Sequence, residues 1–329
     1  MKYRQFGRLK WEISEVGYGM WGMGGEWKGG TDEEAIEGLR LAAEMGCNFF
    51  DTAWIYGSGH SESLFKKALA ERHNLKEKSK KIYVATKVPP KNFKWPGVAT
   101  DPIIETYPSA HIIDYCNKSL DNLGTEYIDL LQLHVWDDSW AKSDEWKMAV
   151  EILKKQGLIK GFGISVNKWE SSNILEAIKT GLIDSIQVVY NIFEQAPEDG
   201  LFPECKARDI AVIARVPFDE GSLTGSYKRD TVFERGDWRA KFYTPEMLNH
   251  SIDRLEKIKE VVPSGMALSQ LALRFILQNE VISTVIPGMR RITHVEENLA
   301  VSDGIKLNSE LYKKLKTFRW DRNPLVFKA

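Results

Sequence analysis

The chain has 329 residues, and its 45 Lys and Arg nearly balance its 46 Asp and Glu, which gives a formal net charge of -1. A chain of this length can bury a large hydrophobic core, and its balanced charge argues against a nucleic-acid-binding surface, which needs clustered positive charge. No run of about 18 consecutive apolar residues occurs, so no membrane-spanning segment is expected.

The cysteines and the N-terminus indicate a cellular compartment. Cys47, Cys116 and Cys205 are far apart and odd in number, which predicts neither a disulfide framework nor a cysteine-based zinc site. Residues 1–5 are polar and lack the apolar region of a secretory signal. Together these features predict a cytoplasmic protein.

Short runs of β-branched and aromatic residues recur along the chain as expected of strands. Several are almost entirely apolar, which is typical of parallel strands that helices cover. The segment 3–13, before the first of these runs, is predicted to be a small hairpin. In chain order the eight predicted strands are residues 16–19, 47–50, 82–85, 128–133, 162–165, 186–190, 211–214 and 284–286.

Amphipathic segments with helix start and stop signals lie between the strands. Thr31 and Glu34 form a predicted capping box before the first helix, and Gly46 ends it. Ser109 is predicted to cap the second helix, which Gly124 ends. The predicted helices are residues 35–45, 109–123, 145–156, 169–180, 245–261 and 266–278.

Alternation of strand and helix over eight units predicts an α/β fold with a parallel sheet. Because the composition does not change along the chain, residues 1–329 are predicted to form a single domain, a closed (β/α)8 TIM barrel. The N-terminal β-hairpin would cap this barrel, and the C-terminal residues would form a helical extension. A doubly wound open sheet is the alternative. In a TIM barrel, chemistry takes place at the C-terminal ends of the strands.

The glycines at residues 17–22 formally match the G-x-G-x-x-G pattern of dinucleotide-binding turns. Such a turn must pass directly into a helix, whereas the first helix here begins only near Thr31. The pattern therefore predicts a flexible loop over the barrel mouth, not a Rossmann site.

Four chemically active side chains follow three successive predicted strands. Asp51 and Tyr56 follow the second strand, Lys87 the third and His134 the fourth. Taken singly, each has an ordinary structural interpretation: a capping Asp, a packed Tyr, a solvated Lys and a core His. His134 has no partner at metal-ligand spacing, so no metal site is expected.

Taken together, these residues match the needs of carbonyl reduction. A Tyr hydroxyl has a pKa of about 10, and a neighbouring Lys ammonium lowers it by favouring the phenolate. Asp51 can keep Lys87 charged, and a neutral His134 can orient a substrate oxygen. The set therefore suits a proton donor, Tyr56, beside a carbonyl that receives a hydride.

The chain resembles the aldo-keto reductase family over essentially its whole length. The resemblance rests on the motif at residues 51–57, on Lys87, and on the motif Gln132-Leu133-His134. It implies catalytic roles for Asp51, Tyr56, Lys87 and His134. It also implies a (β/α)8 barrel that binds NADP(H) in extended form without a Rossmann domain, with NADH tolerated.

The resemblance also implies a set of cofactor-binding residues. These belong to the first glycine loop, the ends of the fifth to seventh strands, the loop that folds over the pyrophosphate, and the adenine end. They are Gly19, Met20, Trp21, Ser165, Asn167, Gln187, Arg215, Pro217, Phe218, Gly221, Leu223, Gly225, Gly288, Arg290, Arg291, His294, Glu297 and Asn298.

Three of these positions depart from the family pattern. Val166 separates Ser165 from Asn167, which the family has side by side. Arg215 stands where an aromatic side chain stacks on the nicotinamide, and its charge would disfavour the oxidised ring. His294 stands where many NADP-preferring members have a second Arg, so the preference for NADPH is expected to be less steep.

Most of the 11 tryptophans follow predicted strands, which places them at the expected substrate mouth. Trp21, Trp54, Trp95 and Trp136 are the predicted substrate-binding residues, because indole faces stack on sugars and aromatic rings. Other tryptophans in these loops are Trp27, Trp140, Trp169 and Trp238. The Pro-rich segment 91–108 is predicted to be a lid.

The expected function is NADPH-dependent reduction of a sugar-type or aromatic aldehyde or ketone, or the reverse oxidation. A cofactor-binding regulatory subunit with little turnover, as in the channel-associated members of the family, is the first alternative. A barrel isomerase for a phosphorylated substrate is the second. The expected partner is a small molecule, and a homo-oligomer is left open.

Overall fold

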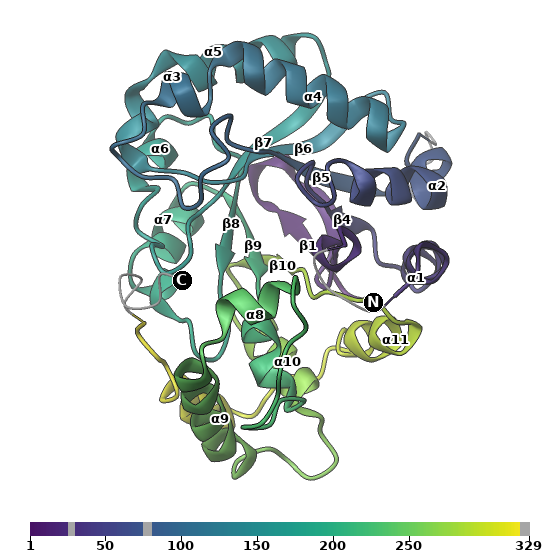
Figure 1. The fold of residues 1–329 in the computed structure, drawn as a ribbon, viewed down its shortest axis with the longest axis vertical. Helices are drawn as coiled ribbons and strands as arrows, with labels where there is room; N and C mark the ends of the chain where they lie inside the picture. The colour runs from purple at the N-terminus through teal and green to yellow at the C-terminus, as the bar shows by residue number, and fades with distance from the viewer. Residues whose placement is uncertain (26–29, 75–80, 323–329) are drawn as a thin grey trace.

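The computed structural model describes residues 1–25, 30–74 and 81–322. Its centre is one sheet of eight parallel strands that pair in chain order, with helices around the outside (Figure 1). The strands are β3 (Tyr18–Gly19), β4 (Phe49–Asp51), β5 (Tyr83–Val88), β6 (Ile128–Leu133), β7 (Ile159–Ser165), β8 (Ser185–Val189), β9 (Ala211–Arg215) and β10 (Ile282–Val285).

The first and last strands of this sheet meet and close the barrel. Val16 bridges Val285, and Gly19 bridges Gly288, both in parallel. The Gly19 amide donates to the carbonyl of Pro287 at 3.0 Å. A Cβ on Gly19 would lie 2.6 Å from the Ile286 carbonyl oxygen, so the closure requires glycine here. The predicted TIM barrel is confirmed, and the open sheet is wrong.

The predicted hairpin is also confirmed, as β1 (Tyr3–Phe6) paired antiparallel to β2 (Trp11–Ser14). Phe6 stacks on Trp11 and packs against Phe49 of β4, each at 5.5 Å between ring centroids. The hairpin therefore closes the N-terminal end of the barrel with apolar side chains, which leaves the opposite end for the functional site.

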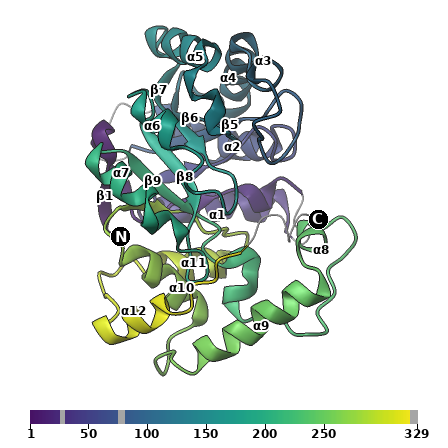
Figure 2. The ribbon, with the colours of Figure 1, turned by 90° about the vertical axis from the view of Figure 1, so that its left-hand side faces the viewer.

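Helices cover the outside of the barrel, and the late ones gather at the end of the molecule away from α3, α4 and α5 (Figure 2). They are α1 (Asp32–Glu44), α2 (His60–Asn74), α3 (Ile103–Thr106), α4 (Ser109–Leu123), α5 (Asp144–Lys155), α6 (Leu175–Lys179), α7 (Leu201–Ala207), α8 (Trp238–Phe242), α9 (Pro245–Lys259), α10 (Leu268–Leu277), α11 (Ile292–Ala300) and α12 (Ser309–Lys316). None of them is long and apolar enough to cross a membrane.

The helix signals in the sequence predict the helix start correctly at α1, where a capping box is formed. They do not predict helix starts that depend on packing with other parts of the chain. The capping box of Thr31 and Glu34 is present. Ser109, in contrast, lies inside its helix, and its hydroxyl donates to the Glu145 carbonyl at 2.5 Å instead of capping. The predicted helix 169–180 is reduced to α6. Trp169 takes a left-handed backbone with φ of 60°, and Ile174, directly before α6, has a non-helical φ of −161°. Helix α2 was not predicted, since it buries the polar Ser61 and Glu62 and so lacks a clear apolar stripe.

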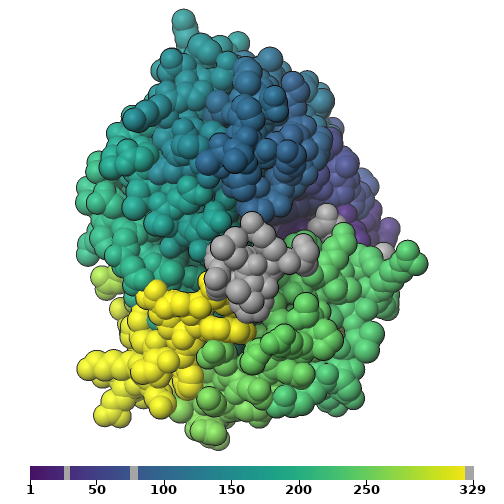
Figure 3. Space-filling view, turned by 60° about the vertical axis from the view of Figure 1, so that its left-hand side comes forward, coloured from purple at the N-terminus to yellow at the C-terminus, as the bar shows by residue number. Residues whose placement is uncertain are grey.

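The C-terminal extension is confirmed as α12 and, among the described residues, the segment 317–322. In Figure 3 this yellow segment lies alongside the green segment that contains α8 and α9. Arg254 of α9 lies over the Trp320 ring, 4.3 Å from its centroid. Arg322 makes a buried ion pair with Asp219 at 2.7 Å, which ties the C-terminal segment to the loop after β9.

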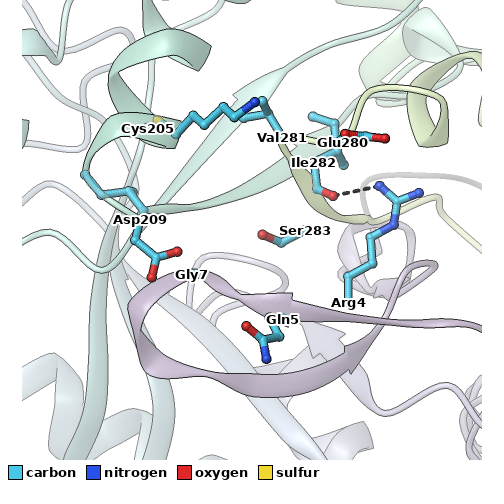
Figure 4. Close-up of a pocket in the computed structure, with 11 residues that line it drawn as sticks. Arg4, Gln5, Gly7, Cys205, Asp209, Glu280, Val281, Ile282 and Ser283 are labelled. Atoms are coloured by element: carbon cyan, nitrogen blue, oxygen red, sulfur yellow. Dashed lines mark hydrogen bonds between the residues drawn. The ribbon is translucent and has the colours of Figure 1, made fainter.

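A pocket of about 480 Å³ lies between the hairpin and the N-terminal ends of β9 and β10 (Figure 4). Arg4 crosses it and donates to the Ile282 carbonyl at 2.9 Å. None of the predicted site residues lines this pocket. It lies at the end of the barrel that the hairpin covers, opposite the C-terminal ends of the strands.

Candidate active site

Neighbouring strands bring the four predicted catalytic residues together. Asp51 ends β4, and Tyr56 lies in the turn that follows it. Lys87 lies on β5, and His134 directly follows β6. Because β4, β5 and β6 pair in that order, the C-terminal ends of these strands place the four side chains at one end of the barrel.

Lys87 is the centre of this group, and its side chain has no exposed surface. Its ammonium lies 2.5 Å from Asp51 Oδ1 and donates to the Thr52 carbonyl at 2.7 Å. The third contact is with the Tyr56 hydroxyl at 3.5 Å. Burial lowers the pKa of Lys87, and the Asp51 carboxylate opposes that shift. The ion pair therefore favours a charged ammonium beside the tyrosine oxygen.

Two glutamines complete the shell around Asp51. The amides of Gln187 and Gln132 donate to Asp51 Oδ2 at 2.7 and 3.2 Å. Sequence reasoning assigned Gln187 to the cofactor and gave Gln132 no role. In the structure both residues help to satisfy a carboxylate that is only 2% exposed.

His134 stands opposite Tyr56, with the two ring centroids 5.7 Å apart and nearly perpendicular. The buried Tyr107 hydroxyl accepts from the backbone amides of His134 and Val135, at 3.1 Å each. Tyr107 thus fixes the backbone that carries the imidazole, a contribution without any signal in the sequence.

His134 is held neutral by its surroundings. Burial lowers its pKa well below the usual value, and the charges of Lys87 and Arg215 lower it further. Its Nδ1 is buried and has no hydrogen-bond partner among the described residues. A neutral imidazole beside a phenol can hydrogen-bond an oxygen atom placed between them.

The segment after β7 carries the two residues assigned to the nicotinamide amide. Ser165, which ends β7, is 3% exposed. The Asn167 amide nitrogen donates to the Gly97 carbonyl at 2.8 Å and to Glu170 at 2.9 Å, and its Oδ1 accepts from the Gly97 amide at 3.3 Å. Both amide hydrogens of Asn167 are therefore used within the protein.

Arg215 ends β9 beside this segment. One Nη donates to the Val166 carbonyl at 2.8 Å, whereas Nε is buried without a partner among the described residues. Burial lowers the pKa of its guanidinium, while Tyr56, Glu220 and Asp51 oppose that shift. The guanidinium is thus held through one Nη, while its Nε has no hydrogen-bond partner among the described residues.

The loop after β9 has an unusual backbone. Val216, Asp219, Glu220 and Gly221 all have positive φ, and so does Gly225 at the end of the 3-10 helix η6 (Asp219–Thr224). Such a conformation is costly for residues other than glycine and persists only where neighbours hold it.

Five side chains hold this loop. Asn191 donates to the Val216 carbonyl at 2.9 Å, Tyr227 donates to the Glu220 carbonyl at 2.8 Å, and three others contact Asp219 or Glu220. Lys168 forms an ion pair with Glu220, which is 2% exposed at its side chain, and Tyr243 donates to the Asp219 carbonyl at 2.8 Å. The third is Arg322, through its ion pair with Asp219. The sequence reasoning missed Lys168, although it directly follows Asn167.

The remaining predicted cofactor residues lie along the same mouth or in the adjoining core. The side chains of Met20 and Leu223 are buried in the core, at 0% and 1% exposure, so only their backbone can reach a ligand. Pro217 is buried, Phe218 is partly buried and Gly288 is exposed. At α11, Asn298 is 5% exposed and Glu297 is exposed.

Positive charge gathers at the start of α11. Arg291 is its N-cap residue, and the first turn contains no acidic side chain. The charges of Arg291 and Arg290 both contribute to lowering the pKa of His294, after burial. The Arg290 stem lies against Gly22, where a Cβ would be 2.7 Å from its Cδ. A helix N-terminus with two arginines suits an anion.

The tryptophans predicted to bind substrate lie in different surroundings. Trp21 lies 6.4 Å from the Tyr56 ring, and Trp95 lies edge-on to His134 at 5.9 Å. Trp54 packs edge-on against Tyr115 of α4 at 4.7 Å.

The prediction that Trp136 binds substrate is wrong. It is 0% exposed and packs against Trp140 and Trp146 at 5.8 and 5.6 Å, so it belongs to the core and is not a pocket wall. Part of the tryptophan excess is therefore core and not binding surface. Trp27 lies outside the described residues.

Comparison with known proteins identifies the family. The sequence model of the Aldo/keto reductase family matches residues 15–319. The chain belongs to the aldo-keto reductase family. Members reduce carbonyl groups with NAD(P)H, so this aldo-keto reductase is an oxidoreductase that acts on small carbonyl compounds.

Individual relatives agree with this assignment. Aldo-keto reductase YhdN of Bacillus subtilis (strain 168) is 30% identical over 323 residues, which are 96% of this chain and 93% of that protein. The holo form of an aldo-keto reductase from Bacillus halodurans has a TM-score of 0.76 and 28% identity, over 98% of this chain and 97% of that one. A glycerol dehydrogenase from Gluconobacter oxydans has a TM-score of 0.77 and 26% identity, over 96% and 94%.

Proposed function

We propose that this aldo-keto reductase is an NADPH-preferring reductase of aldehydes or ketones in which Tyr56 donates the proton. The observation that carries the proposal is the contact of 3.5 Å between the Lys87 ammonium and the Tyr56 hydroxyl, with Asp51 behind the ammonium. A buried cation next to the phenol stabilises the negative charge that develops on its oxygen as the proton leaves.

The substrate oxygen would lie between Tyr56 and His134. The neutral imidazole holds that oxygen by a hydrogen bond and sets its direction, while the phenol hydroxyl delivers the proton to it. Lys87 remains charged throughout because Asp51 accompanies it in the buried site. The same three groups act in reverse order if an alcohol is oxidised, with the tyrosine oxygen accepting the proton.

The residues around this group fit a nicotinamide nucleotide, which supplies the hydride when it is bound. The unpartnered Nε of Arg215 and the nearly buried Ser165 lie at the strand ends next to the catalytic group. A planar guanidinium can stack on the nicotinamide ring in place of an aromatic side chain. Its positive charge disfavours a positively charged oxidised ring, so we expect Arg215 to favour release of the oxidised form.

The preference for NADPH is carried by the start of α11. Arg290, Arg291 and His294 surround a helix N-terminus, and the 2′-phosphate is the group that distinguishes NADPH from NADH. Gly221, Leu223 and Gly225 belong to the loop after β9, which we assign to the pyrophosphate. Met20 and Gly19 would contribute backbone only.

The substrate is inferred to carry a flat apolar part. Trp21 and Trp95 stand beside Tyr56 and His134, and Trp95 is 44% exposed next to Phe93, which is 50% exposed. Such open aromatic faces bind aromatic rings or the C–H faces of sugars.

The test is to mix the protein with NADPH and a panel of aromatic, sugar and small aliphatic aldehydes, and to follow NADPH absorbance. Turnover that prefers NADPH to NADH is expected, with the highest kcat/KM for the aromatic or sugar compounds. Tight NADPH binding without turnover of any compound would favour the regulatory-subunit alternative. Absence of NADPH quenching of tryptophan fluorescence would overturn both.

A further inference from the structure

The segment 91–108, expected to be a lid, is fixed to the barrel. The Trp140 indole donates to the Asp101 carbonyl at 3.0 Å, and within the segment the Lys91 amide donates to the Thr106 carbonyl at 2.8 Å. Gly97 is buried against the same tryptophan, where a Cβ would lie 3.0 Å from Trp140 Cη2 and 3.2 Å from the Trp136 carbonyl carbon. The middle of the segment is therefore held in one place.

Asn167 reaches Gly97 from another part of the barrel and hydrogen-bonds both backbone polar groups of that residue. Its amide donates to the Gly97 carbonyl at 2.8 Å and accepts from the Gly97 amide at 3.3 Å. The remaining amide hydrogen goes to Glu170 at 2.9 Å. At 5% exposure, Asn167 has no donor left for a ligand.

Gly97 is two residues after Trp95, so the Asn167 contact determines where that indole lies. Trp95 stands edge-on to His134 with 5.9 Å between ring centroids, and Phe93 lies 6.4 Å from Trp95 on the same segment. Both rings are about half exposed. They form an open aromatic wall next to the imidazole, which we call the Phe93–Trp95 wall.

We propose that Asn167 is a positioning residue for substrate specificity: through Gly97 it holds the Phe93–Trp95 wall against His134. It does not bind the cofactor. This inference rests on the proposed reductase function and assigns the wall to carbonyl compounds with an aromatic or other flat apolar group. The extra residue Val166 moves Asn167 away from Ser165 in the sequence and leaves it free for this role.

The first experiment compares Asn167→Ala with Ser165→Ala as the matched variant on the cofactor side. For Asn167→Ala we expect KM for an aromatic aldehyde such as 4-nitrobenzaldehyde to rise about tenfold, as two buried hydrogen bonds are lost. KM for methylglyoxal, kcat and the NADPH Kd from fluorescence quenching should change less than about twofold. Ser165→Ala should weaken NADPH binding instead. Equal loss of NADPH affinity in the two variants would overturn the proposal.

A double-variant cycle then tests the route through Trp95. In a Trp95→Ala background, Asn167→Ala should have little further effect on KM for the aromatic aldehyde, because the wall it positions is already gone. Fully additive effects would contradict the proposal.

A readout without turnover separates this proposal from the reductase function. Trypsin should cleave the Lys94–Trp95 bond several times faster in Asn167→Ala than in the unaltered protein, and Gly97→Ala should do the same. Unchanged cleavage in both variants would show that Asn167 does not hold the segment. If cleavage is faster but the unaltered protein turns over no carbonyl compound, Asn167 holds the segment as proposed, and the proposed reductase function is wrong.

Discussion

The Lys87 ammonium lies 2.5 Å from the Asp51 carboxylate in a site where neither side chain exceeds 3% exposure. Such a buried ion pair is expensive to break, because the partner that remains is an unpaired charge in a nonpolar interior. The pair also stands directly behind the Tyr56 hydroxyl. Stability and chemistry therefore depend on the same two residues, and substitutions can separate the two contributions.

Asp51→Asn is expected to reduce the free energy of unfolding by about 3–5 kcal/mol, since it leaves the Lys87 ammonium buried without its countercharge. Adding Lys87→Met removes that charge and should restore much of the stability without restoring activity. Urea denaturation measures the first effect and NADPH consumption the second. A fully stable Asp51→Asn protein would show that the pair carries little energy.

Tyr56→Phe is expected to lower kcat by about 10²–10⁴-fold, because it removes the proton donor and leaves the ring in place. The NADPH Kd from tryptophan quenching should stay unchanged. Tyr3→Phe is the matched control, since Tyr3 lies in the N-terminal hairpin at the opposite end of the barrel, where its hydroxyl donates to the Gly46 carbonyl at 3.0 Å. Full turnover by Tyr56→Phe would reject the proposed donor.

The pH profile should lack a histidine inflection. Because burial and two nearby cations hold the pKa of His134 well below its usual value, the imidazole stays neutral as the pH falls through the normal histidine range. We expect kcat/KM to show no loss from this group between about pH 7.5 and 5.5. An inflection near about pH 6.5 that His134→Gln abolishes would contradict the neutral imidazole.

Arg291→Ala should weaken NADPH binding about tenfold and leave NADH binding unchanged, since the N-cap arginine of α11 is proposed to meet the 2′-phosphate. The difference should shrink as salt is added. Fluorescence titration with the two nucleotides measures it. Equal loss for both nucleotides would place Arg291 elsewhere along the cofactor.

The buried carboxyl group of Glu194 should make the free energy of unfolding depend on pH. Burial raises its pKa from 4.5 to about 7, and the nearby Arg322 only partly opposes the shift. The folded protein thus binds this proton more tightly than the unfolded chain, so its contribution to stability is lost as pH rises from about 4.5 to about 7. Glu194→Gln should raise the free energy of unfolding at pH 8, by at most about 3 kcal/mol, and have little effect below pH 4.5.

The control for this measurement is Glu37→Gln on the exposed face of α1, which should change stability little at either pH. A Glu194→Gln protein that is no more stable than the unaltered chain at pH 8 would show that the carboxyl is solvated.

The local signals in the sequence were sufficient for the barrel. Apolar runs and stop glycines located all eight strands within a few residues, and the capping box of Thr31 and Glu34 is formed as expected. Both signals depend on neighbours in the chain, which is why a single sequence contains them. The spacing of Asp51, Tyr56, Lys87 and His134 at three successive strand ends depends on the same periodicity, and the structure brings these side chains together.

Tertiary packing decided the roles of Trp136 and Asn167, which the local sequence pattern could not. The sequence alone determined that Trp136 follows a strand and that Asn167 lies two residues after Ser165, and both facts suggested a ligand. The fold places Trp136 among Trp140 and Trp146, and gives both amide hydrogens of Asn167 to Gly97 and Glu170. Residues 97 and 167 are far apart in the chain, and the pairing of β5 with β6 and of β6 with β7 brings the segments that follow β5 and β7 within hydrogen-bonding distance. Whether a polar or aromatic side chain serves a ligand or the protein itself depends on such long-range contacts, which satisfy its bonds before any ligand arrives.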